Sequence, residues 1–262
     1  MRWHLACFAG AKTDSTANEA VPIVSDPVLT PFSTTQYLLP FDCQAFGLVA
    51  ANDTITRARL VTESLRTLGL PEIFPLNVVA EPTLPIGIDW RLADPVKLRR
   101  NDSISIQCSN GASTADFAWA AAYLRRQYFP VPAGPVTTLT GTSAQTLVAN
   151  AYTLGGITFD QTPPVGDYAV IGMKVVCADA WFARLVFPAD QSMRPGVVTG
   201  ETVAGWEYTQ TERHGRLGEW GRFHSVNVPQ LEILGHTAGA ETARVYMDVV
   251  QLTDRATPVL VA

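Results

Sequence analysis

Charge is what this 262-residue sequence has least of. Asp, Glu, Lys and Arg together make up 16% of it and hydrophobic residues make up 47%, whereas an ordinary soluble domain has about 25% charged residues. A disordered chain would need the opposite balance. The charges sum to −5, with 24 acidic and 19 basic residues, so the chain as a whole does not attract phosphate. We therefore expect a packed core and no sequence-specific nucleic acid as a partner.

Long apolar runs and paired cysteines are also missing. The longest apolar run, Phe117–Leu124, falls far short of the roughly 20 residues that a membrane-spanning helix needs. The cysteines lie far apart and never form the CxxC pairs of a zinc site. We expect them to be buried free thiols, as in a reducing compartment. They are Cys7, Cys43, Cys108 and Cys177.

Catalytic signatures are absent as well. The sequence contains no P-loop, no dinucleotide GxGxxG, no GxSxG elbow and no HExxH, which are the patterns that hold phosphates, nucleophiles or zinc. Its four histidines never show the clustered HxH spacing of a metal-dependent β-barrel enzyme. We therefore expect no enzymatic activity, no cofactor and no metal.

Helical periodicity is scarce, and strand patterns take its place. The best helix candidate, Thr62–Pro71, is short and is closed by Gly and Pro. Elsewhere 18 Pro and 19 Gly cut the chain into short runs rich in Val, Ile and Thr, as in sandwiches and barrels. Ser103–Cys108 alternates between apolar and polar residues and is followed by Asn110-Gly111, a pair that hairpin turns favour. The sequence predicts an all-β protein.

Internal repeats predict two similar halves. Ala58–Val61 recurs as Ala183–Val186, at an offset of 183 − 58 = 125 residues. Gly111–Ala115 is echoed by Gly239–Ala243, at an offset of 239 − 111 = 128. A third match, at 231 − 104 = 127, joins two apolar strand faces in the same order along the chain, Ile104/Ile106 and Leu231/Ile233. Matches in one order with slowly rising offsets are typical of a duplication.

The repeat also decides two local structures. Phe117–Leu124 has the alanine content of a helix, but its counterpart Val245–Leu252 alternates like a strand, so we predict a strand in both. Gly111, together with Asn110, and Gly239 are expected in equivalent hairpin turns, where bulky substitution would destabilise each half.

The predicted fold class is all-β, with two tandem β-sandwich or jelly-roll-like barrels, a short helix and an extended N-terminal arm. The divisions are an N-terminal arm (1–34), a first β-barrel (35–128), a Pro-rich linker (129–139), a second β-barrel (140–256) and a tail (257–262).

One polar, aromatic segment, residues 206–224, is the candidate interaction loop. Its Trp and Tyr rings could support sugar faces, with Glu212 and Glu219 as a carboxylate pair. Alternatively, its opposite charges pair with each other or with a neighbouring subunit. The candidate residues are Trp206, Tyr208, Glu212, Arg213, His214, Glu219, Trp220 and Arg222.

Two arginine pairs, Arg99-Arg100 and Arg125-Arg126, border strands of the first half. They could meet phosphate or the acidic groups of a partner. Because the sequence shows no aromatic residues interleaved with them, we favour the interpretation of a solvated sheet edge.

Two β-sandwich halves, carried by the Ala58–Val61 and Gly111–Ala115 echoes and joined by a Pro-rich linker, resemble a viral, phage-type major capsid protein of the double jelly-roll kind. The resemblance implies paired barrels, three chains in a pseudo-hexagonal capsomer and an icosahedral shell around DNA, with no catalytic residues. It implies that the chain resides in the virion after assembly in the host cytoplasm. Its partners would be other copies, other virion proteins and, indirectly, an internal membrane.

One feature departs from that family. Its members often carry a flanking helix in each barrel, which Thr62–Leu70 could supply in the first half but Asp190–Pro195 cannot easily supply in the second.

The low charge fits a shell protein, because broad contacts between copies favour small and neutral residues. The sequence therefore predicts a self-assembling capsid subunit. The alternative is a tandem β-sandwich module that binds glycans or decorates a virion through residues 206–224.

Overall fold

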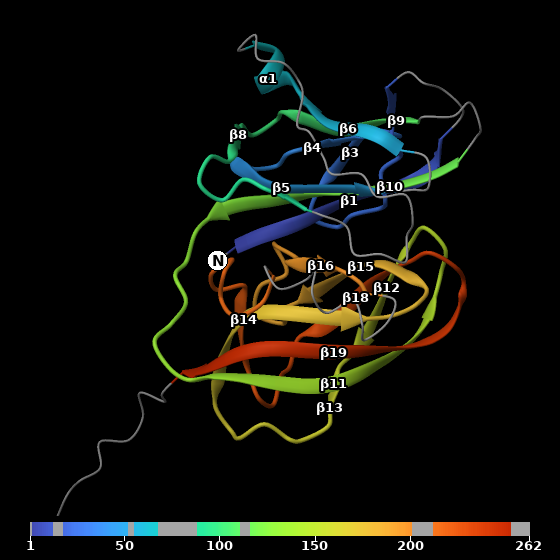
Figure 1. Cartoon of the computed structure of the whole chain (residues 1–262). Coiled ribbons are helices and arrows are strands. Elements are labelled where there is room, and N and C mark those ends of the chain that lie inside the picture. The colour runs from blue at the N-terminus through green and yellow to red at the C-terminus, as the bar shows by residue number, and fades with distance from the viewer. Residues whose placement is uncertain are drawn as a thin grey trace, which may run out of the picture.

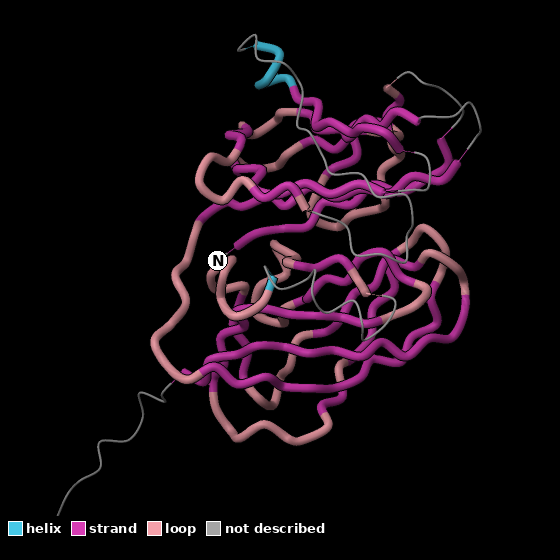
Figure 2. Tube along the Cα trace, viewed as in Figure 1, coloured by secondary structure: helices cyan, strands magenta, loops and turns pink. Residues whose placement is uncertain are grey.

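The computed structural model describes residues 2–12, 18–51, 55–67, 88–110, 116–200 and 212–252. The described chain is all-β, with antiparallel strands throughout and one short helix, α1 (Glu63–Thr67) (Figure 2). Among these residues no helix is long and apolar enough to cross a membrane. The all-β class predicted from the sequence is confirmed.

The first half contains two sheets, which we call A and B. In sheet A the strands lie in the order β1-β10-β5-β7, and β8 also pairs with β5. In sheet B the order is β2-β9-β4-β3, and β6 also pairs with β9. The strands are β1 (Arg2–Lys12), β2 (Glu19–Ala20), β3 (Thr30–Ser33), β4 (Gln36–Leu38), β5 (Cys43–Ala51), β6 (Ile55–Thr62), β7 (Asp89–Trp90), β8 (Val96–Leu98), β9 (Ser103–Asn110) and β10 (Asp116–Gln127).

The second half contains sheets C and D. Sheet C has the order β13-β11-β19-β14-β17 and sheet D the order β12-β18-β15-β16. The strands are β11 (Val136–Leu147), β12 (Tyr152–Gly156), β13 (Thr158–Phe159), β14 (Asp167–Val176), β15 (Ala180–Val186), β16 (Gly196–Val198), β17 (Gly221–His224), β18 (Gln230–Gly235) and β19 (Gly239–Leu252).

The two halves share one strand order. In each, the first strand pairs with the last, which pairs with a central strand, as β1-β10-β5 and β11-β19-β14. The second sheets match in the same way, as β2-β9-β6 and β12-β18-β15. This two-sheet arrangement, in which the first and last strands are neighbours, is that of a jelly roll.

The ladders place Ala58–Val61 and Ala183–Val186 in equivalent strands but correct one detail of the repeat. Leu60 pairs with Ile106 and Leu185 pairs with Leu231, and both separations are 46 residues (106 − 60 and 231 − 185). The offset of 125 therefore extends to β9 and β18, where the sequence match suggested 127. A shift of two residues preserves the strand face, which is why the apolar pattern concealed it.

The four sheets are stacked as layers in the order B, A, D, C (Figure 1). Aromatic contacts join the middle layers: Trp119 of sheet A stacks on Trp181 of sheet D with ring centroids 4.7 Å apart. A backbone hydrogen bond from the amide of Leu5 to the carbonyl of Arg194, 3.0 Å long, joins the halves as well.

The expected N-terminal arm is not an arm over its first residues. Residues Arg2–Lys12 form β1, which pairs along its length with β10, and Trp3 and Leu5 are fully buried. The sequence interpretation rested on Ser, Thr and Pro content, which is concentrated after residue 12, whereas 2–12 are apolar enough to be an inner strand.

Three smaller differences concern the boundaries and turns. The strand β11 begins at Val136, inside the segment expected to be linker. Gly239 is the first residue of β19, paired with Leu147, and a Cβ there would meet nothing within 4 Å. It therefore follows the hairpin turn as the first strand residue, and its surroundings give no steric reason for bulky substitution to destabilise this half. Asn110 ends β9, and Gly111 lies outside the described residues.

The cysteines are buried free thiols, as predicted. Burial raises the pKa of Cys7 to about 12 and that of Cys177 to about 11, so both stay protonated and unreactive at neutral pH.

Candidate functional site

Sheet A is buried on both faces, because sheet B covers one face and sheet D of the second half covers the other. On β10, Ala118, Ala120 and Ala122 belong to the core of the first half. Trp119 and Tyr123, on the opposite face, belong to the cluster that continues into the second half. The alanine-rich run is thus a strand, as predicted, with small side chains facing its own sandwich and large ones facing the partner sandwich.

This strand also shows where the sequence match misleads. An offset of 128 pairs Trp119 with Met247. However, Trp119 faces away from its own sandwich, while Met247 lies in the interior of its own, with Arg244, Tyr246 and Asp248 on the other face of β19. The two strands are equivalent in topology, but their sequence alignment is displaced by an odd number of residues.

A buried ionic network crosses the same contact. The Arg184 guanidinium on β15 donates to a Glu232 carboxylate oxygen on β18, from Nε over 2.8 Å. It also donates from Nη1 to the Leu5 carbonyl of β1 over 3.1 Å and pairs with Asp26. Its plane lies 3.7 Å from the Tyr152 ring centroid. Arg184 therefore links both halves through charge, backbone and ring contacts at once.

The network also includes His4 and Asp26, which are buried, and Arg194, which is partly buried. His4 Nε2 lies 3.1 Å from Asp26 Oδ2, and Arg194 pairs with the other oxygen of Glu232. Burial lowers the pKa of His4, which favours its neutral form. Burial opposes ionisation of Asp26 too, but His4 and Arg184 outweigh it, so the pKa of Asp26 lies below its ordinary value.

Sequence reasoning did not identify this network. The signal was present, because Arg184 stands between Ala183 and Leu185 in a strand that is otherwise apolar. An arginine inside such a strand needs a partner surface that neutralises it.

The candidate loop contributes to the contact, and its residues Glu219–Arg222 also line a hollow of about 390 Å³. Glu212, Arg213, Glu219 and Trp220 are buried, and Trp220 is 2% exposed with its ring centroid 4.9 Å from that of Trp3. The Trp220 ring is therefore not accessible as a sugar platform. Trp206 and Tyr208 lie outside the described residues.

Several of the described charges of the loop have partners within the chain. Arg213 Nε donates to Asp248 over 2.9 Å, and Arg222 Nε donates to Glu219 over 2.8 Å. The Tyr123 hydroxyl donates to Glu212 over 2.7 Å. Glu212 and Glu219 thus have separate partners and do not form the carboxylate pair considered from the sequence. His214 and Arg222 remain exposed.

Among the described carboxyls of the loop, Glu212 has a strongly shifted pKa. Burial raises its pKa to about 8, against the opposing effect of the Tyr123 hydrogen bond. It is therefore largely protonated at neutral pH, which suits a group enclosed at the contact between the two halves.

The loop follows the linker closely enough to require a glycine. Gly218 has a φ of +82°, and a Cβ there would lie 2.4 Å from the Phe129 carbonyl oxygen. The next residue continues this contact, because the Glu219 amide donates to the same carbonyl over 3.0 Å. The loop is thereby fixed against the segment that joins the two halves.

A basic cluster, which we call the basic end, lies where β1 starts and β10 ends. Three adjoining hollows share lining residues there: one of about 430 Å³ with Arg100 and Arg126, one of about 650 Å³ with Arg125 and Arg126, and one of about 350 Å³ with Arg125 and Arg216. The six cations of the basic end are Lys97, Arg99, Arg100, Arg125, Arg126 and Arg216.

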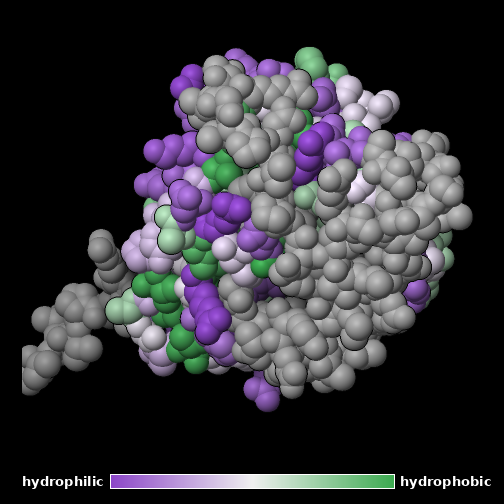
Figure 3. Space-filling model, turned by 45° about the horizontal axis from the view of Figure 1, so that its top comes forward, coloured by the Kyte–Doolittle hydropathy of each residue, from purple (hydrophilic) through white to green (hydrophobic). Residues whose placement is uncertain are grey.

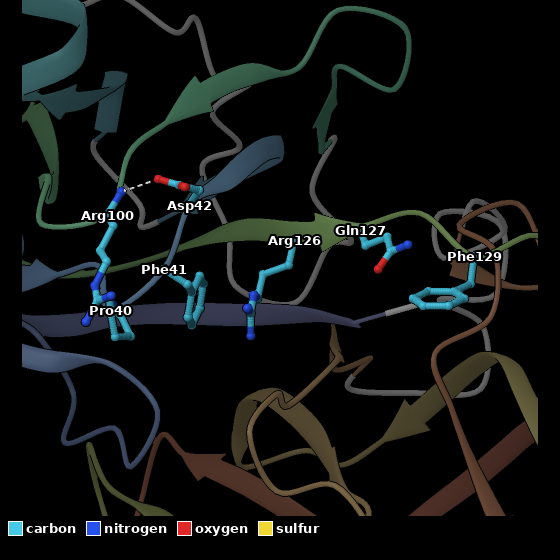
Figure 4. Close-up of a pocket in the computed structure, with 7 residues that line it drawn as sticks. All are labelled: Pro40, Phe41, Asp42, Arg100, Arg126, Gln127 and Phe129. Carbon is cyan, nitrogen blue, oxygen red and sulfur yellow. Dashed lines mark hydrogen bonds between the residues drawn. The ribbon is translucent and has the colours of Figure 1, made fainter.

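The structure thus brings together the two arginine pairs that the sequence placed near one sheet end, and it adds the aromatic residues. The Arg126 guanidinium lies 5.1 Å from the Phe41 ring centroid, and the two side chains lie next to each other with Arg100 beyond them (Figure 4). On the face shown in Figure 3, hydrophilic and hydrophobic residues lie beside each other over the described part of the surface.

The outer faces of sheets B and C, at the two ends of the stack, are lined differently. On sheet B, Arg59 donates from Nε to Gln107 over 2.9 Å, in a half-buried pair, and Phe32 of β3 is 64% exposed. On sheet C, Thr138 and Thr140 donate to Asp248 and Asp160, each over 2.7 Å.

Comparisons with known proteins give little to set beside this geometry. No protein-family model and no curated protein matches the chain. A search of solved structures finds the major capsid protein P2 from bacteriophage PM2, at 9% sequence identity, with 98% of this chain and 100% of that chain covered. The TM-score is 0.24, and at that value the similarity carries no argument about fold or function.

Proposed function

We propose that this protein is a structural virion protein, a capsid subunit that assembles with copies of itself into trimers and then into a closed shell. It would act in the virion and without catalysis. The proposal rests on one observation of the chain itself, the way in which its two similar halves contact each other.

The contact between the halves is head to tail. In each half, one sheet contains the first and last strands (A and C) and the other does not (B and D). The contact joins sheet A of the first half to sheet D of the second half, and so to a sheet of the other kind. A symmetric pair would join two sheets of the same kind, whereas a head-to-tail contact uses two different surfaces and can be repeated. The contact therefore leaves one sheet of each kind, C and B, without a sheet of the other half against its outer face.

Repeating the contact between chains would place sheet C of one copy against sheet B of the next. Head-to-tail contacts generate rings when the rotation closes, and three chains with two halves each would form a ring of six similar units. The outer face of sheet C fits such a contact in composition, because it carries threonines and a charge already paired within the chain. On sheet B the charge of Arg59 faces a neutral amide, that of Gln107.

The test is the mass of the purified protein in solution. Light scattering should give 3 × 28.4 kDa, about 85 kDa, and electron microscopy should show six-lobed particles or larger shells. A strictly monomeric species at every salt and protein concentration would refute the proposal.

A further inference from the structure

We propose that the basic end binds the phosphate groups of single-stranded nucleic acid, without sequence specificity. The inference goes beyond assembly and does not depend on it, because the site is complete within one chain.

The charge of the basic end is concentrated and not neutralised. Among the described residues no carboxylate forms an ion pair with any of its six cations. One carboxylate, that of Asp42, lines the hollows, and it accepts a hydrogen bond of 2.7 Å from the Arg100 backbone amide. The other charged residues of the chain sum to −11 (13 basic and 24 acidic) if the six are set aside. The low net charge thus conceals a strong local positive potential.

Aromatic rings and amides hold the guanidinium groups in place. Arg125 lies 5.3 Å from the Phe46 ring centroid and 5.7 Å from that of Tyr128, and it donates to Gln44 over 3.0 Å. Neutral partners of this kind orient a guanidinium without satisfying its charge, so N–H groups remain for a phosphate. Arginine suits the task because its planar fork matches two phosphate oxygens.

The layout of the cations fits an extended polyanion. They are spread over three hollows, of which the middle one shares Arg126 with one neighbour and Arg125 and Tyr128 with the other, so successive phosphates of one strand can be held in turn. The Tyr128 ring is 52% exposed beside them, which allows a base to stack on it in the manner of single-strand binding surfaces.

An anionic membrane fits the same surface less well. Binding to a lipid surface needs apolar side chains that insert beside the cations. Among the described residues that line the hollows, the exposed large hydrophobic side chains are Leu92 and Tyr128, and the cations lie in concave rather than protruding positions.

The experiment measures the binding of a fluorescent oligothymidylate to the full-length protein by anisotropy, over a range of salt concentrations. We expect binding whose logarithm falls with the logarithm of salt at a slope of about −2 to −3, as for three or four phosphate contacts. The variant R99Q/R126Q should bind about tenfold more weakly and with a slope smaller by about 1.4, since each lost contact contributes about 0.7.

The matched control is R59Q/R244Q, which removes the same charge from the outer faces of sheets B and C and should bind like the unchanged protein. The proposal is overturned if the unchanged protein does not bind the oligonucleotide at low salt. It is also overturned if both variants lose affinity equally, or if only phosphatidylglycerol vesicles bind. The oligomeric state of each variant, measured in parallel, separates this result from the test of assembly.

Discussion

Sheets B and D occupy equivalent places in the two halves, yet only sheet D is covered by a sheet of the other half. Their central pairs are equivalent by position: Arg59 with Gln107 and Arg184 with Glu232, at offsets of 184 − 59 = 125 and 232 − 107 = 125. The pair on sheet B joins Arg59 to the neutral amide of Gln107. The covered pair joins Arg184 to a carboxylate and adds Asp26 from the other half.

The difference shows how one inherited strand pattern serves two environments. On a face open to water an arginine needs no counter-charge, because solvent screens it. Once a second sheet covers the face, the same arginine must be neutralised within the protein. A partner that covers sheet B would therefore have to bring its own hydrogen-bond acceptor to Arg59.

The largest effect is expected from removing a large buried side chain at the contact between sheets A and D. Replacing Trp119, which is 1% exposed against Trp181 and Phe182, by Ala should lower the free energy of unfolding by about 3–5 kcal/mol because of lost burial and a cavity. The matched F32A change on the exposed sheet should stay within about 0.5 kcal/mol. Urea unfolding of both variants makes the comparison, and equal losses would contradict the assignment of covered and exposed faces.

The next largest effect is expected from replacing Arg184, and it is compared with replacement of its counterpart Arg59. R184M leaves Asp26 and Glu232 buried without their shared cation, and should cost about 3 kcal/mol of unfolding free energy. R59M removes only a half-buried contact with Gln107 and should cost less than about 1 kcal/mol. Similar values for the two variants would mean that the network does not hold the halves together.

A smaller effect is a pH dependence. Glu212 has an ordinary pKa near 4.5 and a folded pKa of about 8, so between these values the folded state holds more protons than the unfolded one. The free energy of unfolding should therefore fall as pH rises from about 5 to 8, by at most about 1.4 kcal/mol per unit. E212Q should flatten this slope in urea unfolding, and an unchanged slope would assign it to other groups.

The smallest effect on folding is expected from reversing the charge of Arg59 on sheet B. R59E should leave the free energy of unfolding within about 0.5 kcal/mol of the unchanged protein. If sheet B receives sheet C of another copy, the same change should raise the monomer fraction seen by light scattering. If R59E assembles like the unchanged protein, the contact between chains must use a surface other than sheet B.

The fold could be predicted from the sequence where the repeat provided a second, equivalent segment with a clearer pattern. Phe117–Leu124 has the composition of a helix, and only its counterpart in β19 indicated a strand. The residue-level alignment was less reliable, because period-two patterns tolerate shifts between strands. Residues 2–12 were misjudged because the composition of a long N-terminal stretch was averaged.

The site could be predicted only in part, since contacts between sheets leave a weak trace in sequence. Arg222 and Glu219 pair with each other, as one of the two alternatives had it, whereas Arg213 pairs with Asp248 outside the loop. Asp26, 158 residues from Arg184, could not have been matched to it by spacing. Two of the aromatic partners, Phe41 and Phe46, come from distant parts of the chain and could not be found by spacing, whereas Tyr128, two residues after Arg126, was overlooked.

The linker between β10 and β11 has a consequence for the order of assembly. A short tether holds its two ends at an effective concentration in the millimolar range, so sheets A and D meet within each chain before two chains meet. In a ring of three chains, half of the six contacts would then be formed in advance, and only three encounters would remain. The later contacts could be weak and reversible, which would let a wrongly placed subunit dissociate before the shell closes.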